Sequence, residues 1–155
     1  MSRPQTNGVA ERAVRRVKEG TSTTLLQSGF EDQWWSEAMS CYCFLRNIVD
    51  TLRNDKTAYE TRFGAEFRGP IVRFGAEVQY KPSSDADKAR LPAFGENVLP
   101  GLFAGYHQHT GGGWSGDVYV IDQENLEDSE SYSDVYLRRV SATEINILYN
   151  SLYFY

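Results

Sequence analysis

The hydrophobic pattern of this chain changes near residue 71, and that change restricts the possible folds more than any other feature. Before it, apolar residues recur at helical spacing over residues 9–27 and again from residue 31. After it, short apolar runs alternate with Gly, Pro and Asp, which is typical of β-strands joined by turns. We therefore expect an α+β fold, in which an N-terminal helical pair precedes a small antiparallel β-barrel.

The first helix should cover residues 9–27. Asn7, in an Asn-Gly turn, is placed to cap its N-terminus, and Gly29 stands where a left-handed C-terminal stop is expected. One face of this helix is apolar and should turn toward the core. That stripe consists of Ala10, Val14, Val17, Thr21 and Leu25.

The second helix should begin near the acidic pair at residues 31–32 and form the main core helix. Trp34 and Trp35 are most simply read as core-filling side chains. A short connection predicts that the two helices pack as an antiparallel pair. A third, shorter helix is expected over residues 58–63, ending at Gly64.

Four strands are expected in the second half, at residues 78–81, 101–106, 117–121 and 135–140. Residues 82–85 and 109–113 should be loops, and the acidic stretch 122–134 a solvated one. Residues 145–155 are apolar and aromatic without an obvious partner, so they could form a strand, a helix or no fold of their own. The expected organisation is helices at 1–52, a linker with a short helix at 53–70, the barrel at 71–141 and an apolar tail at 142–155.

Composition limits the cellular setting. The apolar runs are too short to cross a bilayer, and no leader precedes the first helix, so no membrane partner is expected. The chain begins like a piece cut from something longer. Cys41 and Cys43 lie too close together on a helix to form a disulfide, which fits a reducing cytoplasmic or nuclear compartment.

The charge is unevenly distributed. The formal net charge of −5 does not by itself suggest a nucleic-acid binder. Residues 1–20, however, hold five basic and two acidic side chains, whereas residues 122–134 hold six acidic and no basic ones. The local basic patch is therefore more informative than the total charge.

Glu11 lies within that patch. In a continuous helix, Glu11, Arg15 and Lys18 share one face, so a carboxylate could hold a divalent metal while the cations approach phosphate. The ordinary alternative is a first-turn acid paired with Arg15 on a solvated surface. Metal-dependent phosphoryl transfer needs two or three carboxylates from different elements, and spacing alone favours the surface pair.

Other patterns offer weaker signals. The glycines at 111–113 lack a following Lys-Ser/Thr pair, so a hairpin loop is favoured over a phosphate loop. Cys41 and Cys43, with His107 and His109, do not have zinc-ligand spacing. No Ser/His/Asp arrangement or nucleophile elbow is present in the sequence.

Several motifs, taken in order, resemble Copia-type retrotransposon integrases. Residues 7–12, Asn-Gly-Val-Ala-Glu-Arg, resemble the signature that closes the family's catalytic core. The further matches are Trp-x-Glu-Ala at 35–38 with Tyr-x-Phe-Leu-Arg-Asn at 42–47, Lys-Thr-Ala-Tyr-Glu at 56–60, Arg-Phe-Gly-Ala at 73–76, Pro-Gly-Leu-Phe-Ala-Gly-Tyr at 100–106 and Tyr-Val-Ile-Asp at 119–122. The resemblance covers roughly residues 3–140.

The resemblance implies a ribonuclease H-like core whose two aspartates and one glutamate bind two Mg²⁺ or Mn²⁺ ions for DNA strand transfer. Glu11 would be the third acid and a metal ligand. Asn7, Arg12, Arg15 and Lys18 would contact DNA, at element ends and target, and the full-length protein would self-associate. The helical pair would be the end of that core, and an SH3-like barrel would begin near Ile71.

The chain departs from the family by lacking both catalytic aspartates and the zinc-binding His/Cys module, which lie upstream in the family. A lone carboxylate supplies too few ligands, so we predict that the purified chain does not cut or join DNA and binds no metal by itself. Metal-dependent strand transfer by the chain would overturn this prediction. The alternative is a non-catalytic DNA- or protein-binding module or a decayed transposon remnant. The sequence leaves the barrel's partner, the oligomeric state and the target preference open.

Overall fold

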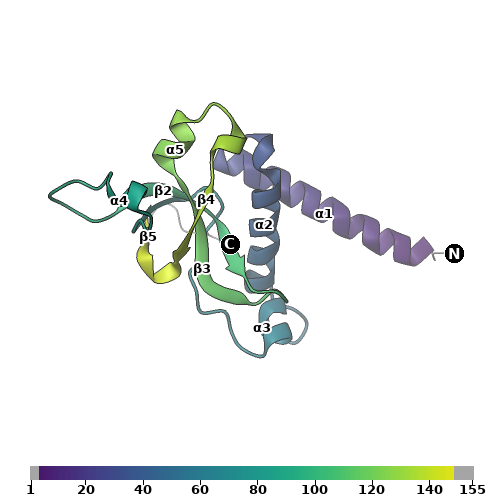
Figure 1. Ribbon diagram of the computed structural model, residues 1–155. Helices are drawn as coiled ribbons and strands as arrows, with labels where there is room; N and C mark the ends of the chain where they lie inside the picture. Colours follow the sequence, from purple (N-terminus) through teal and green to yellow (C-terminus); the bar gives the residue numbers. More distant parts are fainter. Residues whose placement is uncertain (1–3, 149–155) are drawn as a thin grey trace.

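A computed structural model describes residues 4–148 and has the expected α+β class, with helices followed by a five-stranded antiparallel sheet (Figure 1). The N-terminal half contains α1 (Pro4–Ser28), the 3-10 helix η1 (Asp32–Trp34), α2 (Trp35–Val49) and α3 (Ala58–Phe63). The strands are β1 (Glu77–Tyr80), β2 (Leu99–Gln108), β3 (Trp114–Asp122), β4 (Leu137–Ser141) and β5 (Ile145–Ile147). Between them lie the short helices α4 (Asp85–Lys88), α5 (Gln123–Asp128), η2 (Tyr132–Asp134) and η3 (Ala142–Glu144).

Helix α1 starts earlier than its sequence pattern predicts. It begins at Pro4, so Asn7 and Gly8 lie inside the helix, and the prediction that Asn7 caps it after a turn is wrong. Proline suits the first turn of a helix, and a single internal glycine costs only about 1 kcal/mol. The predicted stop is confirmed, because Gly29 has a φ of 75° and its N–H donates to the Leu25 carbonyl at 3.0 Å.

Only the C-terminal half of α1 packs on the body of the protein. Thr21 and Leu25 are buried, whereas Ala10 and Val14 are exposed, so the predicted apolar stripe faces the core only in part. The cause is the divergence of α1 and α2 from their connection, which makes the N-terminal half of α1 project from the molecule (Figure 1). The two helices of the expected antiparallel pair thus cross at an angle (Figure 1).

Helix α2 is the main core helix, but the two tryptophans where η1 meets it differ. Trp34 is 4% exposed, whereas Trp35 is 56% exposed, so the prediction that both fill the core is wrong for Trp35. Consecutive residues on a helix point in directions about 100–120° apart, so the two side chains have different surroundings, and Trp34 packs against the rings of Phe30 and Tyr132. Helix α3 has the predicted bounds, and Gly64 ends it at a φ of 74°.

The sheet has the order β4-β3-β2-β1-β5, and the four predicted strands are confirmed with small shifts of their ends. The fifth strand, β5, comes from the apolar tail and pairs with β1; residues 149–155 of that tail lie outside the described part. Over residues 4–148 the sheet is open, with β4 and β5 at its two edges, so the expected barrel closure is not confirmed.

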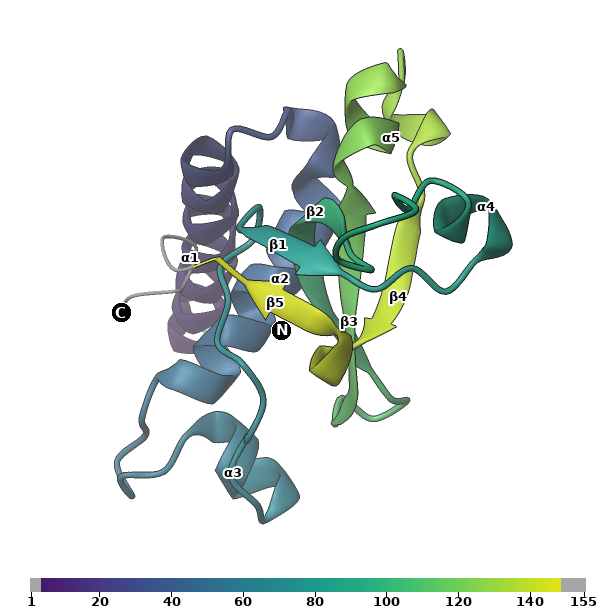
Figure 2. The ribbon, with the colours of Figure 1, turned by 90° about the vertical axis from the view of Figure 1, so that its left-hand side faces the viewer.

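The sheet is nevertheless strongly curled. Four strand spacings separate the edges of a flat five-stranded sheet by about 19 Å. Here β4 ends at Ser141 and β5 begins at Ile145, and the four steps between these residues, through η3, advance the chain by only about 8 Å. The two edges therefore approach each other where β4 ends and β5 begins (Figure 2).

Helices and sheet share one hydrophobic core. Helix α2 packs on the sheet through Phe44, whose ring stacks on that of Tyr106 at a centroid distance of 4.4 Å. The Tyr106 hydroxyl donates to the Pro70 carbonyl at 2.6 Å, which ties the segment before β1 to the same cluster. Buried members from each part include Leu25, Ala38, Ile48, Val78, Phe103, Val120 and Ile121.

Candidate nucleic-acid interface

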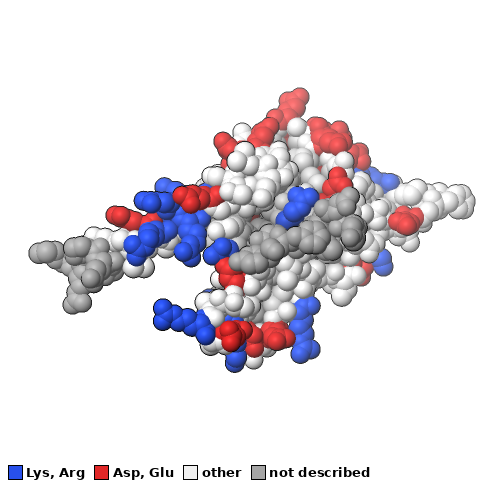
Figure 3. Space-filling view, turned by 180° about the vertical axis from the view of Figure 1, so that it is seen from behind, with Lys and Arg blue, Asp and Glu red and all other residues white. Residues whose placement is uncertain are grey.

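The projecting half of α1 carries the charged residues singled out from the sequence. Glu11, Arg12, Arg15 and Lys18 are all exposed. Because the helix is continuous from Pro4 to Ser28, Glu11, Arg15 and Lys18 lie on one face. Basic side chains form a visible cluster along this helix (Figure 3).

The α1 cations are available to an external anion. Within residues 4–148, none of the salt bridges involves an α1 side chain. The Glu11–Arg15 pair that the spacing allows is therefore not formed there. Binding a phosphate would therefore not require these arginines to give up a carboxylate. From Arg12 to Lys18 the helix advances about 9 Å, which matches two to three successive phosphates along one DNA strand. This geometry suits contact with a nucleic-acid backbone.

Glu11 by itself does not fit a catalytic metal centre. Its carboxylate is exposed on the projecting helix. Among residues 4–148, no group of three or more Asp, Glu, His or Cys side chains is arranged to hold a metal ion. Strand-transfer chemistry with two metals needs several converging carboxylates, and this helix supplies one.

The cysteines and histidines lie in separate structural contexts. Cys41 is buried on α2, and burial raises the pKa of its thiol. His107 is near the end of β2, where its Nδ1 lies 2.7 Å from the Ser115 hydroxyl oxygen. Residues 109–113 form the hairpin loop predicted for the glycine run, closed by hydrogen bonds between His109 and both Gly112 and Gly113.

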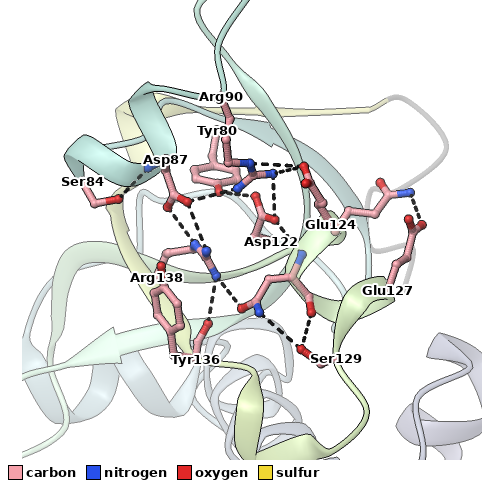
Figure 4. Close-up of polar contacts among 12 residues, drawn as sticks. Tyr80, Ser84, Asp87, Arg90, Asp122, Glu124, Glu127, Ser129, Tyr136 and Arg138 are labelled. Atoms are coloured by element: carbon pink, nitrogen blue, oxygen red, sulfur yellow. Dashed lines mark hydrogen bonds and ion pairs between the residues drawn. The ribbon is translucent and has the colours of Figure 1, made fainter.

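A second polar cluster lies on the sheet. Its central residue, Asp122, departs from the expected solvated stretch at 122–134, whose other acidic residues are exposed. Asp122 ends β3 and is 0% exposed. Its carboxylate accepts hydrogen bonds from the Tyr80 hydroxyl at 2.5 Å and from Arg90 Nη2 at 3.0 Å (Figure 4). It also caps α5 by accepting from the Asn125 backbone N–H at 2.9 Å. Much of this acidic stretch is thus an ordered helix with a buried anchor.

Asp87 connects this anchor to β4. Its carboxylate is 4% exposed and accepts from Arg90 at 3.0 Å and from Arg138 Nε at 3.0 Å (Figure 4). Arg138 also donates to the Asn125 side chain and lies over the Tyr136 ring at 3.9 Å. Every buried charge in the network has an opposite partner, which is the arrangement of a structural ion cluster.

This network has almost no signature in the sequence, because its charged residues are widely separated along the chain. Arg90 and Arg138 lie 32 and 51 positions from Asp122 and Asp87. Only two local signals point to it. Asp122 stands at the end of an apolar strand, and Ser84, which caps α4, stands shortly before Asp87.

Acidification should weaken the fold through these two carboxylates. Hydrogen bonds from Arg138 hold the pKa of Asp87 below its usual value against the opposing effect of burial. Burial also opposes ionisation of Asp122, but hydrogen bonds from Arg90 and Tyr80 outweigh it and lower that pKa as well. A lowered folded-state pKa means that the stabilisation is complete above the unfolded pKa, about 4, and is lost as pH falls toward the folded value.

We therefore expect urea unfolding midpoints to be nearly constant between about pH 6 and 8 and to fall progressively below about pH 5. The Asp87→Asn/Asp122→Asn variant should be less stable at neutral pH and lose less stability on acidification. Equal acid sensitivity in both proteins would assign the effect to other carboxylates.

Comparisons with known proteins gave no counterpart, since no family model, no curated protein and no solved structure matches the chain. Within residues 4–148, no helix is both long and apolar enough to span a membrane.

Proposed function

We propose that this chain is a segment of a Copia-type retrotransposon integrase that takes part in DNA integration, and that α1 contacts the DNA. The observation that carries the DNA-contact proposal is the exposed face of the projecting half of α1. Arg12, Arg15 and Lys18 would bind phosphates along that face, with Asn7 one turn closer to the N-terminus. The collinear motifs support the family assignment.

The places of these motifs in the fold are compatible with that proposal. Residues 35–47 form most of α2, and residues 56–60 start α3, where the Thr57 side chain accepts from the Glu60 N–H at 3.1 Å. Residues 73–76 join the helices to the sheet through the Gly75 N–H, which donates to the Phe103 carbonyl at 2.7 Å. These three motifs therefore occupy positions on which the local structure or the packing depends.

We propose that the sheet belongs to an SH3-like barrel. Its support is that β1 pairs with both β2 and β5, and that a single turn of 3-10 helix connects β4 with β5 at opposite edges. A sheet curled in this way needs little further bending to close.

Catalysis would require a larger assembly. Under the proposal, Glu11 is the third acid of the family's active site, and Mg²⁺ or Mn²⁺ bound there would activate the attacking hydroxyl and stabilise the leaving oxygen. In the family, the other two acids lie upstream of the residues that match here.

Removing two α1 cations should weaken DNA binding. In the Arg15→Ala/Lys18→Ala variant, we expect the dissociation constant for duplex DNA to rise. We also expect the slope of the logarithm of this constant against the logarithm of the salt concentration to decrease by up to about two. Fluorescence anisotropy with a labelled duplex at several salt concentrations measures both quantities.

The matched control is Arg53→Ala/Lys56→Ala, which removes the same two residue types from an exposed connector far from α1 in sequence. If both double variants bind equally well, DNA contact through α1 is refuted.

The alternative candidate is a non-catalytic DNA- or protein-binding module. It is favoured by the continuous core that joins α1, α2 and the sheet, because such a core can hold the binding surfaces without further domains.

A further inference from the structure

The loop that connects α4 to β2, residues 89–98, projects from the side of the molecule opposite the N-terminus of α1 (Figure 1). Its Phe94 is 94% exposed, the highest value among the exposed large hydrophobic side chains of residues 4–148. Glu96, two positions later, is also exposed, and it takes part in none of the salt bridges within the described residues. We call this segment the α4–β2 loop. It presents an uncovered aromatic ring beside a carboxylate that has no cation.

The base of the α4–β2 loop is anchored on both sides. Leu91 packs against the hydrophobic core, and Leu99 is buried where β2 begins. Arg90 is held by the ion cluster described above. A loop with fixed ends loses less conformational freedom when its tip is bound, so Phe94 is held ready to enter a partner.

A pocket large enough for such a ring lies where the C-terminal end of α2, helix α3 and the β2–β3 hairpin meet. Its volume is about 250 Å³, and an apolar cavity of about 150 Å³ already accepts a benzene molecule. Its apolar walls come from Phe44, Ala58, Tyr59 and Phe63. Among the described residues that line it, Arg62 is the only charged one. We call this site the α3 pocket.

Arg62 gives the α3 pocket a cation that has no carboxylate. Its guanidinium lies over the Phe63 ring, 5.1 Å from the centroid, and within residues 4–148 it takes part in none of the salt bridges. A bound phosphate would pair with Arg62 but leave the aromatic walls uncovered. An uncharged apolar group would cover the walls but leave the guanidinium unpaired. The pocket therefore suits a ligand that joins an apolar ring to an acid.

The α4–β2 loop of the same sequence has this combination. Two residues span about 7 Å of extended chain, so a Glu96 carboxylate lies within reach of Arg62 when the Phe94 ring occupies the pocket. The loop and the α3 pocket are well separated in both ribbon views (Figure 1 and Figure 2). In this fold, Phe94 therefore fits the pocket of another copy and not that of its own chain.

We infer that the α4–β2 loop of one copy docks in the α3 pocket of a second copy, with Phe94 inserted and Glu96 paired with Arg62. The two surfaces differ, so the contact is heterologous, and a pair of copies keeps one free loop and one free pocket. Association is then head to tail and continues beyond the dimer. It uses none of the α1 cations, so it is independent of the proposed DNA contact.

Sedimentation velocity of the full chain, without DNA, tests the contact. The average mass should rise with protein concentration and should not stop at a dimer. Phe94→Ala should weaken association roughly tenfold or more, because the inserted ring is lost. The matched control is Leu26→Ala, which removes an 83% exposed side chain from α1 and should change association less than about twofold.

A charge exchange tests the ion pair. Arg62→Glu and Glu96→Arg should each weaken association roughly threefold to tenfold at low salt, because each brings two like charges together. The combined variant Arg62→Glu/Glu96→Arg restores an opposite pair and should associate within about twofold of the unsubstituted chain. Circular dichroism verifies that all three variants fold.

A mixing experiment tests the head-to-tail arrangement. Phe94→Ala keeps the α3 pocket but loses the inserted ring. Asn47→Trp, at an exposed position on the wall of the pocket, fills the pocket but keeps the loop. Each variant alone should stay monomeric, whereas their mixture should form a 1:1 pair and nothing larger, because only one of the two contacts remains possible.

Three results would overturn the inference. They are a chain that stays monomeric at every soluble concentration, a charge-exchanged variant that associates no better than the single reversals, and a mixture of the two blocked variants that does not associate. Association that Phe94→Ala abolishes but that stops at a dimer would assign Phe94 to a symmetric contact and exclude the α3 pocket.

Discussion

Asp122→Ala is expected to lower the free energy of unfolding by about 3–5 kcal/mol, because it leaves buried partners without their counter-charge. The Tyr80 hydroxyl would lose its acceptor, Arg90 would lose a fully buried partner, and α5 would lose its cap. Urea denaturation followed by circular dichroism measures the change. A small domain with a typical stability of about 5–15 kcal/mol would be close to unfolded at the upper end of this range.

The control for Asp122→Ala is Glu124→Ala, because Glu124 contacts the same arginine. Glu124 Oε2 lies 2.8 Å from Arg90 Nη2, but its side chain is 61% exposed. Removing an exposed partner should cost less than about 1 kcal/mol. Similar losses in the two variants would show that burial of the Asp122 carboxylate does not determine its contribution.

Gly75→Ala should be the second strongly destabilising substitution, with a cost of about 2–5 kcal/mol. Gly75 has a φ of 82°, which strains any residue that carries a Cβ. A Cβ built there would also lie 2.6 Å from the Cβ of Ser28 and 3.3 Å from its Cα, at the end of α1. The helix end and the strand lead-in would have to separate, and thermal unfolding would show the loss.

Gly64→Ala distinguishes backbone strain from this close contact. Gly64 has a nearly equal φ of 74°, but nothing lies within 4 Å of a Cβ built on it. The strain alone should cost about 1–2 kcal/mol. If Gly75→Ala costs no more than Gly64→Ala, the approach of Ser28 has no energetic consequence.

Sequence reasoning succeeded where a local signal decides the structure. The Gly29 and Gly64 stops, the glycine hairpin after β2 and the change from helical to strand periodicity each depend on neighbouring residues, and all are confirmed. The predicted start of α1 is wrong. Asn7-Gly8 is a strong turn signal, but the helix already begins at Pro4 and continues through both residues.

Long-range packing set the features that were missed. Helical spacing places Ala10 and Val14 on the apolar face of α1. Whether that face is covered depends on how α1 and α2 cross, and both residues are exposed. Asp122 looked like one member of an acidic run, because Arg90 is distant in the sequence. The shared face of Glu11, Arg15 and Lys18 follows from helical geometry, whereas the pocket that Phe30 and Tyr132 both line brings together residues about a hundred positions apart.

The pairing of β1 with β5 has a consequence for folding during synthesis. Val78 pairs with Ile147, so the outer edge of β1 stays without its final neighbour until nearly the whole described chain has left the ribosome. During that interval the nascent chain presents a free strand edge to which another polypeptide could add. The synthesis of β5 thus limits the time over which the edge of β1 is exposed to mispairing.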